Sequence, residues 1–151
     1  MRTGLRRVHL ALILVIALLP FTTVLAEIKE VDSGEARSLL DQGVALIDVR
    51  TPGEWKQTGV IEGSHLLTFF NEQGGYDIAA WMAELGKIVN KDQPFMLICH
   101  VGTRTASITH YLDTKTKYER VINITKGIQN WIESDYPTVP ATTHSKTGES
   151  Q

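Results

Sequence analysis

Residues 95–104 read Phe95-Met96-Leu97-Ile98-Cys99-His100-Val101-Gly102-Thr103-Arg104. The first four are all apolar, and such a short unbroken run beside helices predicts a strand buried on both faces of a parallel sheet. Gly102 permits backbone torsions that a side chain forbids, and a helical pattern follows over residues 105–114. The only cysteine of the chain therefore lies at the carboxyl end of a central strand, where ligands of such sheets bind.

Strands and helices alternate on both sides of this segment. Thr51-Pro52 pairs a capping residue with proline at the first helical position, and apolar residues recur at helical spacing from Ile78 to Val89. Asp32 or Ser33 caps a helix that Gly43 ends. This alternation predicts an α/β domain with a mainly parallel sheet. The other expected strands cover residues 27–31, 44–47, 65–69 and 121–124, and the last helix covers 127–133.

Composition excludes several classes of protein. The chain has 151 residues, 42% of them apolar and 21% charged, which fits one folded domain. A formal charge of −2 provides no basic field for nucleic acid. One cysteine excludes an internal disulfide and a zinc-thiolate site. His65, His110 and His144 have no ligand-like spacing, so no metal site is expected.

The first 26 residues are typical of a secretory signal peptide. Three arginines precede an apolar run over residues 10–19, Pro20 breaks the run, and Val24-Leu25-Ala26 offers a cleavage site. The apolar run is short for a membrane span, which needs roughly 20 residues. A retained membrane anchor is the alternative.

Cleavage after Ala26 would leave one domain over residues 27–140 and a disordered polar tail over 141–151. It removes three of the fifteen basic residues and none of the seventeen acidic ones, so the formal charge becomes −5. We therefore expect an exported, periplasmic protein with no nucleic-acid partner and no stable membrane association after cleavage. In an oxidising compartment an unpaired thiol is either buried or used.

The loop after Cys99 has the features of an anion-binding site. A strand-to-helix loop of this length can turn successive backbone N–H groups toward the first side chain, and the helix dipole adds positive potential there. Both effects favour thiolate over thiol, which makes Cys99 a candidate nucleophile. Arg104 either holds the loop or meets an anionic substrate. A buried structural thiol is the alternative for Cys99.

At this loop the chain resembles a single-domain rhodanese, a sulfurtransferase whose active loop is Cys-x-x-x-x-Arg after a strand. With the export signal, the resemblance is to small periplasmic rhodaneses of the phage-shock type. The chain departs from the family at Gly59-Val60-Ile61-Glu62-Gly63, where Gly-His-Ile-Pro-Gly is frequent. The other matching pieces are Leu46-Ile47-Asp48-Val49-Arg50, Glu54-Trp55, Gly59, Gly63, Gly127, Trp131 and Tyr136-Pro137.

The resemblance implies a three-layer fold with a central five-stranded parallel sheet and helices on both faces. It also implies that Cys99 takes sulfur from a small anionic donor such as thiosulfate and passes it, through a persulfide, to cyanide or a thiol acceptor. No metal or organic cofactor is needed. The implied substrate loop is His100, Val101, Gly102, Thr103 and Arg104, and Asp48, Arg50 and Glu54 are expected to brace it.

Two other functions remain open. A cysteine phosphatase or arsenate reductase also places cysteine and arginine on a strand-to-helix loop, but its loop is one residue longer, and residue 105 is threonine. A non-catalytic rhodanese-like module would bind a partner or carry persulfide without turnover. A disulfide oxidoreductase would need a second, resolving cysteine.

Overall fold

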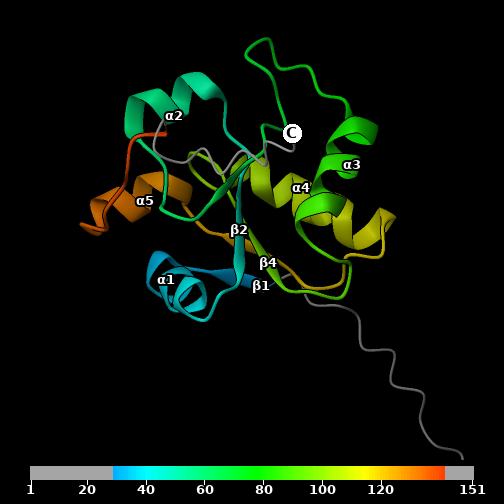
Figure 1. The fold of residues 1–151 in the computed structure, drawn as a ribbon, viewed down its shortest axis with the longest axis horizontal. Coiled ribbons are helices and arrows are strands. Elements are labelled where there is room, and N and C mark those ends of the chain that lie inside the picture. Colours follow the sequence, from blue (N-terminus) through cyan, green and yellow to red (C-terminus); the bar gives the residue numbers. More distant parts are fainter. Residues whose placement is uncertain (1–28, 142–151) are drawn as a thin grey trace, which may run out of the picture.

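The computed structural model describes residues 29–141 of the chain (Figure 1). The signal peptide expected over residues 1–26 and nearly all of the tail expected over 141–151 lie outside the described residues. None of the described helices is long and apolar enough to cross a membrane.

The core of the fold is one sheet of five parallel strands in the order β1-β5-β4-β2-β3. This confirms the expected five-stranded parallel sheet. β4 is the middle strand, and β1, the first strand of the chain, pairs with β5, the last. The strands are β1 Lys29–Val31, β2 Ala45–Asp48, β3 His65–Leu66, β4 Phe95–Ile98 and β5 Val121–Ile124.

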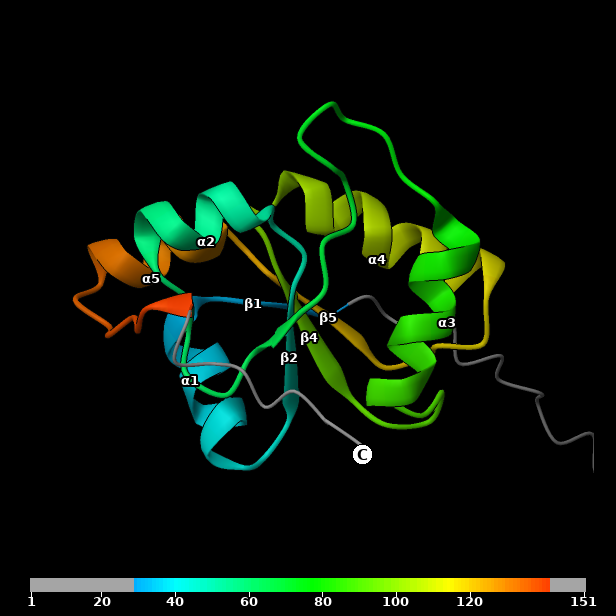
Figure 2. The same cartoon turned by 45° about the horizontal axis from the view of Figure 1, so that its top comes forward.

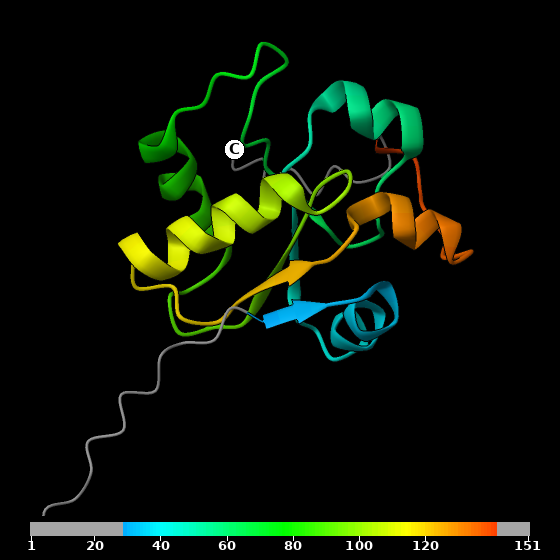
Figure 3. The same ribbon diagram turned by 180° about the vertical axis from the view of Figure 1, so that it is seen from behind.

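Helices cover both faces of the sheet because β4 is apolar on both sides. Phe95 and Leu97 pack in a core with residues of α3 and α4, whereas Met96 and Ile98 pack in a second core with residues of α1 and α5. The two helix layers are visible in Figures 2 and 3. The helices are α1 Ser33–Asp41, α2 Pro52–Thr58, α3 Ile78–Ile88, α4 Thr103–Lys115 and α5 Gly127–Glu133.

The local signals for helix starts are confirmed. Asp32 and Thr51 each accept a hydrogen bond from the backbone N–H three residues later, and the glutamate there bonds back to the capping residue. α2 has no buried residue. Its end is held instead by the segment after α5, because the Thr138 hydroxyl donates to the Thr58 carbonyl and residues 60 and 139 form an antiparallel bridge.

The expected bounds of β3 and α4 were wrong, and β2 lies one residue later than expected. β3 is only His65–Leu66, although the run expected for it extends to Phe69. The chain after β2 turns into α2 at Arg50, and residues 67–69 follow it without regular strand pairing. The Leu67 N–H donates to the Asp48 carbonyl, and the Phe69 N–H donates to the Val49 carbonyl. α4 begins at Thr103, two residues earlier than expected, because Gly102 adopts the left-handed conformation (φ +89°) that starts the helix directly after the loop.

The start of α5 packs directly on the loop after β4. Gly127 has φ +57°, and a Cβ built on it would lie 2.3 Å from the carbonyl oxygen of Cys99. The Ile128 N–H donates to that oxygen at 2.9 Å, and the Gln129 N–H donates to the His100 carbonyl at 3.1 Å. Only glycine allows this approach, so Gly127 fixes the loop against α5.

We expect Gly127→Ala to lower the free energy of unfolding by about 3 kcal/mol, because the new Cβ meets rigid backbone and the residue keeps a positive φ. Urea denaturation measures the loss. Gly86→Ala in α3 is the matched control, since its Cβ would meet only the Tyr118 hydroxyl, at 3.8 Å. That change should raise stability by about 0.5–1 kcal/mol. Equal effects of the two substitutions would contradict the close approach.

Candidate active site

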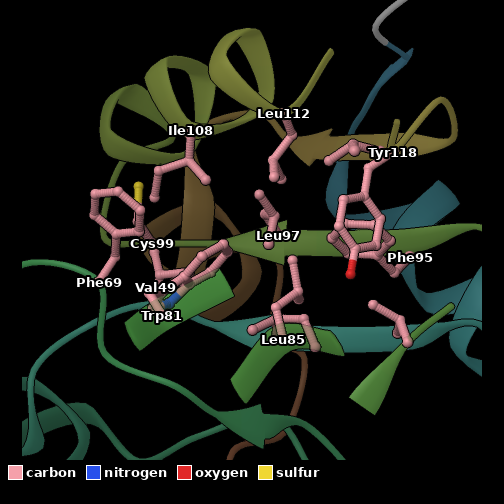
Figure 4. Packing of buried hydrophobic residues seen from close by; sticks show 13 residues of the cluster. Val49, Phe69, Trp81, Leu85, Phe95, Leu97, Cys99, Ile108, Leu112 and Tyr118 are labelled. Carbon is pink, nitrogen blue, oxygen red and sulfur yellow. The ribbon is translucent and has the colours of Figure 1, made fainter. Parts of the chain in front are cut away.

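Cys99 lies directly after β4, and its side chain is completely buried. Strand alternation places it on the same face as Leu97, in the core between the sheet and helices α3 and α4. Figure 4 shows its sulfur in this cluster, near Phe69 and Ile108. The sulfur is therefore directed under the loop rather than into solvent.

Three polar groups interact with the sulfur, and one of them is the Arg104 guanidinium, which forms a hydrogen bond with Cys99. The Gly102 N–H donates to Sγ at 3.1 Å, and the Thr105 hydroxyl oxygen lies 3.5 Å from Sγ. Gly102 is required here, because a Cβ on it would lie 2.9 Å from the Lys126 backbone nitrogen.

The structure differs here from the expected ring of several amides. Within residues 29–141, only the Gly102 amide donates to Sγ. Side chains alternate between the two faces of β4, and this alternation continues to Cys99, one residue past the strand. Sγ therefore points toward the layer of α3 and α4. The first amides of α4 have no acceptor inside the helix, and Gly102, its N-cap residue, supplies no side-chain hydrogen bond.

The other loop residues surround this buried centre. His100, Val101 and Thr103 are exposed, while Gly102 is buried. Val101 is one of the few large apolar residues of the described chain with high exposure, at 42%. The outer surface of the loop is therefore available to a ligand or partner, whereas the sulfur is not.

Arg104 is paired with Glu54 from α2. Its two terminal nitrogens donate to the two carboxylate oxygens of Glu54 at 2.9 and 2.5 Å, and both side chains are about one-quarter exposed. The hydrogen bonds that Arg104 donates to Glu54 raise the pKa of Arg104 against the effect of burial, and the charge of a Cys99 thiolate and a hydrogen bond with Cys99 raise it further. Arg104 thus holds the loop to α2, and its charge is largely neutralised by Glu54.

Glu54 is correspondingly stabilised as a carboxylate. Burial raises its pKa, but hydrogen bonds from Arg104 and the Thr51 backbone, with the charges of Arg104 and Arg50, outweigh burial and lower the pKa from 4.5 to about 2. These contacts connect α2 to the start of α4.

Asp48 and Arg50 form a separate, fully buried ion pair. The Arg50 Nε lies 3.0 Å and its Nη2 2.6 Å from the Asp48 carboxylate. The remaining donors of Arg50 reach the Thr58 hydroxyl and the Gly59 carbonyl. Of the three residues expected as one charge network, Asp48 pairs with Arg50 and Glu54 pairs with Arg104, and the charge of Arg50 also lowers the pKa of Glu54.

An open pocket of about 620 Å³ adjoins the Glu54–Arg104 pair. It lies between the start of α2 and the segment that precedes α3. Cys99 is not among its lining residues, which are Thr51, Glu54, Phe70, Asn71, Glu72, Gly74 and Arg104. No cluster of three or more potential metal ligands occurs among residues 29–141.

Sequence reasoning missed two residues at this centre. Thr105 was considered only as the position that lacks the arginine of a longer phosphatase loop, although a hydroxyl in the first turn of α4 was a usable signal. Gly127 was noted for its match to the family, and its contact with the Cys99 carbonyl depends on tertiary packing between residues far apart in sequence.

Comparison with known proteins agrees with the fold. Residues 32–134 match the family described as Rhodanese-like domain. The chain belongs to the rhodanese-like family. This rhodanese-like chain is 25% identical to the thiosulfate sulfurtransferase GlpE of Pseudomonas syringae, over 75% of this chain and 94% of that one. It is 24% identical to thiosulfate sulfurtransferase 18 of Arabidopsis thaliana, over 74% and 83% of the two chains.

A solved structure gives the same result. The rhodanese-related protein from Thermoplasma volcanium superposes with a TM-score of 0.55 at 26% identity, over 74% of this chain and 97% of that chain. The rhodanese-like domain therefore covers nearly all of the described residues.

The lowered pKa of Glu54 predicts a change of stability in acid. A carboxyl group whose pKa is lower in the folded state stabilises the fold above its unfolded pKa of 4.5. This contribution is lost as the pH falls from 4.5 to about 2. We expect Glu54→Gln to be less stable than the wild type near neutral pH, with the difference shrinking across this range.

Urea denaturation at a series of pH values measures the effect. Glu84→Gln is the matched control, because Glu84 pairs with Lys87 on the exposed surface of α3, and such pairs contribute little. A Glu54→Gln variant whose stability stays parallel to that of the wild type down to pH 2 would contradict the role of the pair.

Proposed function

We propose that this protein is a sulfurtransferase that moves sulfane sulfur from thiosulfate, or a similar small anionic donor, to cyanide or a thiol through a persulfide on Cys99. The observation that carries the proposal is the placement of Cys99. It is the one cysteine of a rhodanese-like chain, it lies at the end of the central strand β4, and a loop amide donates to its sulfur.

The first half-reaction loads sulfur onto Cys99. The thiolate attacks the outer sulfur of thiosulfate, the S–S bond of the donor breaks, and sulfite leaves with the bonding electron pair. The Gly102 amide and the amino-terminal end of α4 lie where negative charge develops on sulfur.

The second half-reaction unloads it. A nucleophilic acceptor attacks the outer sulfur of the persulfide, and the Cys99 thiolate leaves. With cyanide the product is thiocyanate, and no net oxidant or reductant is consumed.

The roles proposed for the other residues follow from their positions: His100, Val101 and Thr103 lie on the exposed side of the loop, and Gly102 donates to the sulfur. Arg104 is held by Glu54 on α2, which the Asp48–Arg50 pair anchors.

Access to the sulfur is a requirement of this mechanism. Cys99 has no exposed surface, and the loop residues His100 and Val101 are exposed next to it. The donor must therefore enter by displacing part of the loop. The second candidate is a rhodanese-like module that binds a partner or carries persulfide without turnover. Burial favours its partner-binding form, because the exposed loop can bind a partner without a path to the sulfur, whereas a persulfide carrier needs the same access for loading.

Cyanolysis separates the two functions. With thiosulfate and cyanide we expect the purified protein to produce thiocyanate, and Cys99→Ser to abolish the reaction because it removes the nucleophile. Ser107→Ala is the control, since Ser107 is exposed on α4 and bonds only within its own helix. That variant should keep the wild-type rate.

Intact mass after thiosulfate treatment gives a second measurement. One added sulfur on the wild type and none on Cys99→Ser would support the persulfide. Loading without thiocyanate release would favour the carrier module. Hydrolysis of aryl phosphates through Cys99 would favour a phosphatase and contradict the proposal.

Export is a further part of the proposal. Residues 1–26 have the sequence features of a signal peptide, and we expect the mature protein to begin at Glu27 and to reside in the periplasm. Expression of the full chain in a bacterium, followed by fractionation and intact mass of the product, tests this. A full-length protein retained in the membrane fraction would favour the anchor instead.

A further inference from the structure

The hydroxyl group of Thr105 lies between the sulfur of Cys99 and the carbonyl of Gly102. Its oxygen is 3.5 Å from Sγ and 3.0 Å from the Gly102 oxygen. Thr105 is completely buried and lies in the first turn of α4. Thr105 and the Arg104 guanidinium, which also hydrogen-bonds Cys99, are both polar side chains at Sγ, and Thr105 is the uncharged one of the two.

The number of available hydrogens shows that the Thr105 hydroxyl cannot make the same two hydrogen bonds when Cys99 is a thiol and when it is a thiolate. A hydroxyl group has one hydrogen to donate and can accept others. When Cys99 is a thiol, S–H can donate to Thr105 while the Thr105 O–H donates to the Gly102 carbonyl. When Cys99 is a thiolate, the sulfur has no hydrogen, and its lone pairs would face those of the hydroxyl oxygen unless the hydroxyl turns.

We propose that Thr105 is a positioning residue for Cys99, whose hydroxyl turns from the Gly102 carbonyl to Sγ when Cys99 loses its proton and thereby stabilises the thiolate. The inference rests on the proposed role of Cys99 as nucleophile. In the thiolate state, Sγ then accepts a hydrogen bond from the Thr105 O–H as well as the one from the Gly102 N–H.

The surrounding structure lets the hydroxyl turn without leaving a buried group unpaired. The Gly102 carbonyl also accepts a hydrogen bond from the Ala106 N–H, at 3.0 Å. It keeps this partner when the Thr105 hydroxyl turns away, so the rotation does not carry the penalty of an unsatisfied carbonyl.

A further donor matters because the sulfur is surrounded by apolar groups. Phe69 and Ile108 belong to the same buried cluster as Cys99, and an ionised group in such a setting needs hydrogen bonds to compensate for lost water. Among the described residues, the ionised side chain that interacts with Cys99, through its charge and a hydrogen bond, is Arg104, which also forms an ion pair with Glu54. The neighbouring His100 is exposed.

The test compares Thr105→Val, which keeps the branched shape and removes the hydroxyl, with Thr105→Ser, which keeps the hydroxyl. The readout is the rate at which iodoacetamide alkylates Cys99 in the full chain, followed by intact mass from pH 5 to pH 10. Cys99 is the only cysteine, so one added group reports on it alone. Iodoacetamide reacts with the thiolate and needs no sulfur donor.

We expect Thr105→Val to react about tenfold more slowly than the wild type at pH 7, a factor equivalent to about 1.4 kcal/mol. The deficit should become smaller as the pH rises, because the hydroxyl acts on the thiolate fraction and not on access to the sulfur. Thr105→Ser should stay within about twofold of the wild type at every pH. If Thr105→Val does not fold, Thr105→Ala compared with Thr105→Ser makes the same test.

Other results would overturn the proposal. Identical pH profiles for Thr105→Val and the wild type would show that the hydroxyl does not stabilise the thiolate. An equal slowing at every pH would indicate altered access to the sulfur. A wild type that shows this alkylation pattern and yet fails to make thiocyanate would refute the proposed turnover and leave the role of Thr105 intact.

Discussion

The buried ion pair between Asp48 and Arg50 is the contact on which the arrangement of the site depends. It joins the end of β2 to the end of α2, because the same guanidinium reaches the Thr58 hydroxyl and the Gly59 carbonyl. α2 has no buried residue of its own. Its position is therefore set by the Asp48–Arg50 pair and by the segment after α5, which bonds to the end of the helix. Since α2 carries Glu54, the pair also determines where Arg104 is held. A buried ion pair is weak evidence for stability. What the Asp48–Arg50 pair does here is to set the position of α2.

The electrostatics of the site follow from this chain of contacts. Glu54 balances the charge of Arg104, so little net positive charge is directed at the sulfur from side chains. The groups that act on the sulfur are local: one backbone amide, one hydroxyl group, the Glu54-paired Arg104 and the dipole at the start of α4. A centre of this kind selects through contacts made at the sulfur itself, and it depends less on attracting anions from a distance.

Much of the fold follows from local rules in the sequence. The apolar run before Cys99 predicts the middle strand, and Thr51-Pro52 predicts the start of α2, because buried parallel strands and helix caps are set by neighbouring residues. The length of β3 depends on where the chain leaves β2 at Arg50, which is tertiary information. The alternation of Phe95, Leu97 and Cys99 does place the sulfur on the α3–α4 face, but the loop pattern alone suggests an open thiol. The pairing of Arg104 with Glu54 joins residues fifty positions apart and needs the folded chain.

The pairing of β1 with β5 has a consequence for the order of events in the cell. Among the described strands, β1 pairs only with β5, the last strand. The sheet is therefore complete only after almost the whole polypeptide has been synthesised. Sheets built from such distant pairings form slowly. During translation, β1 therefore has no strand of the sheet to pair with until β5 has emerged, whereas β2, β3 and β4 can pair earlier.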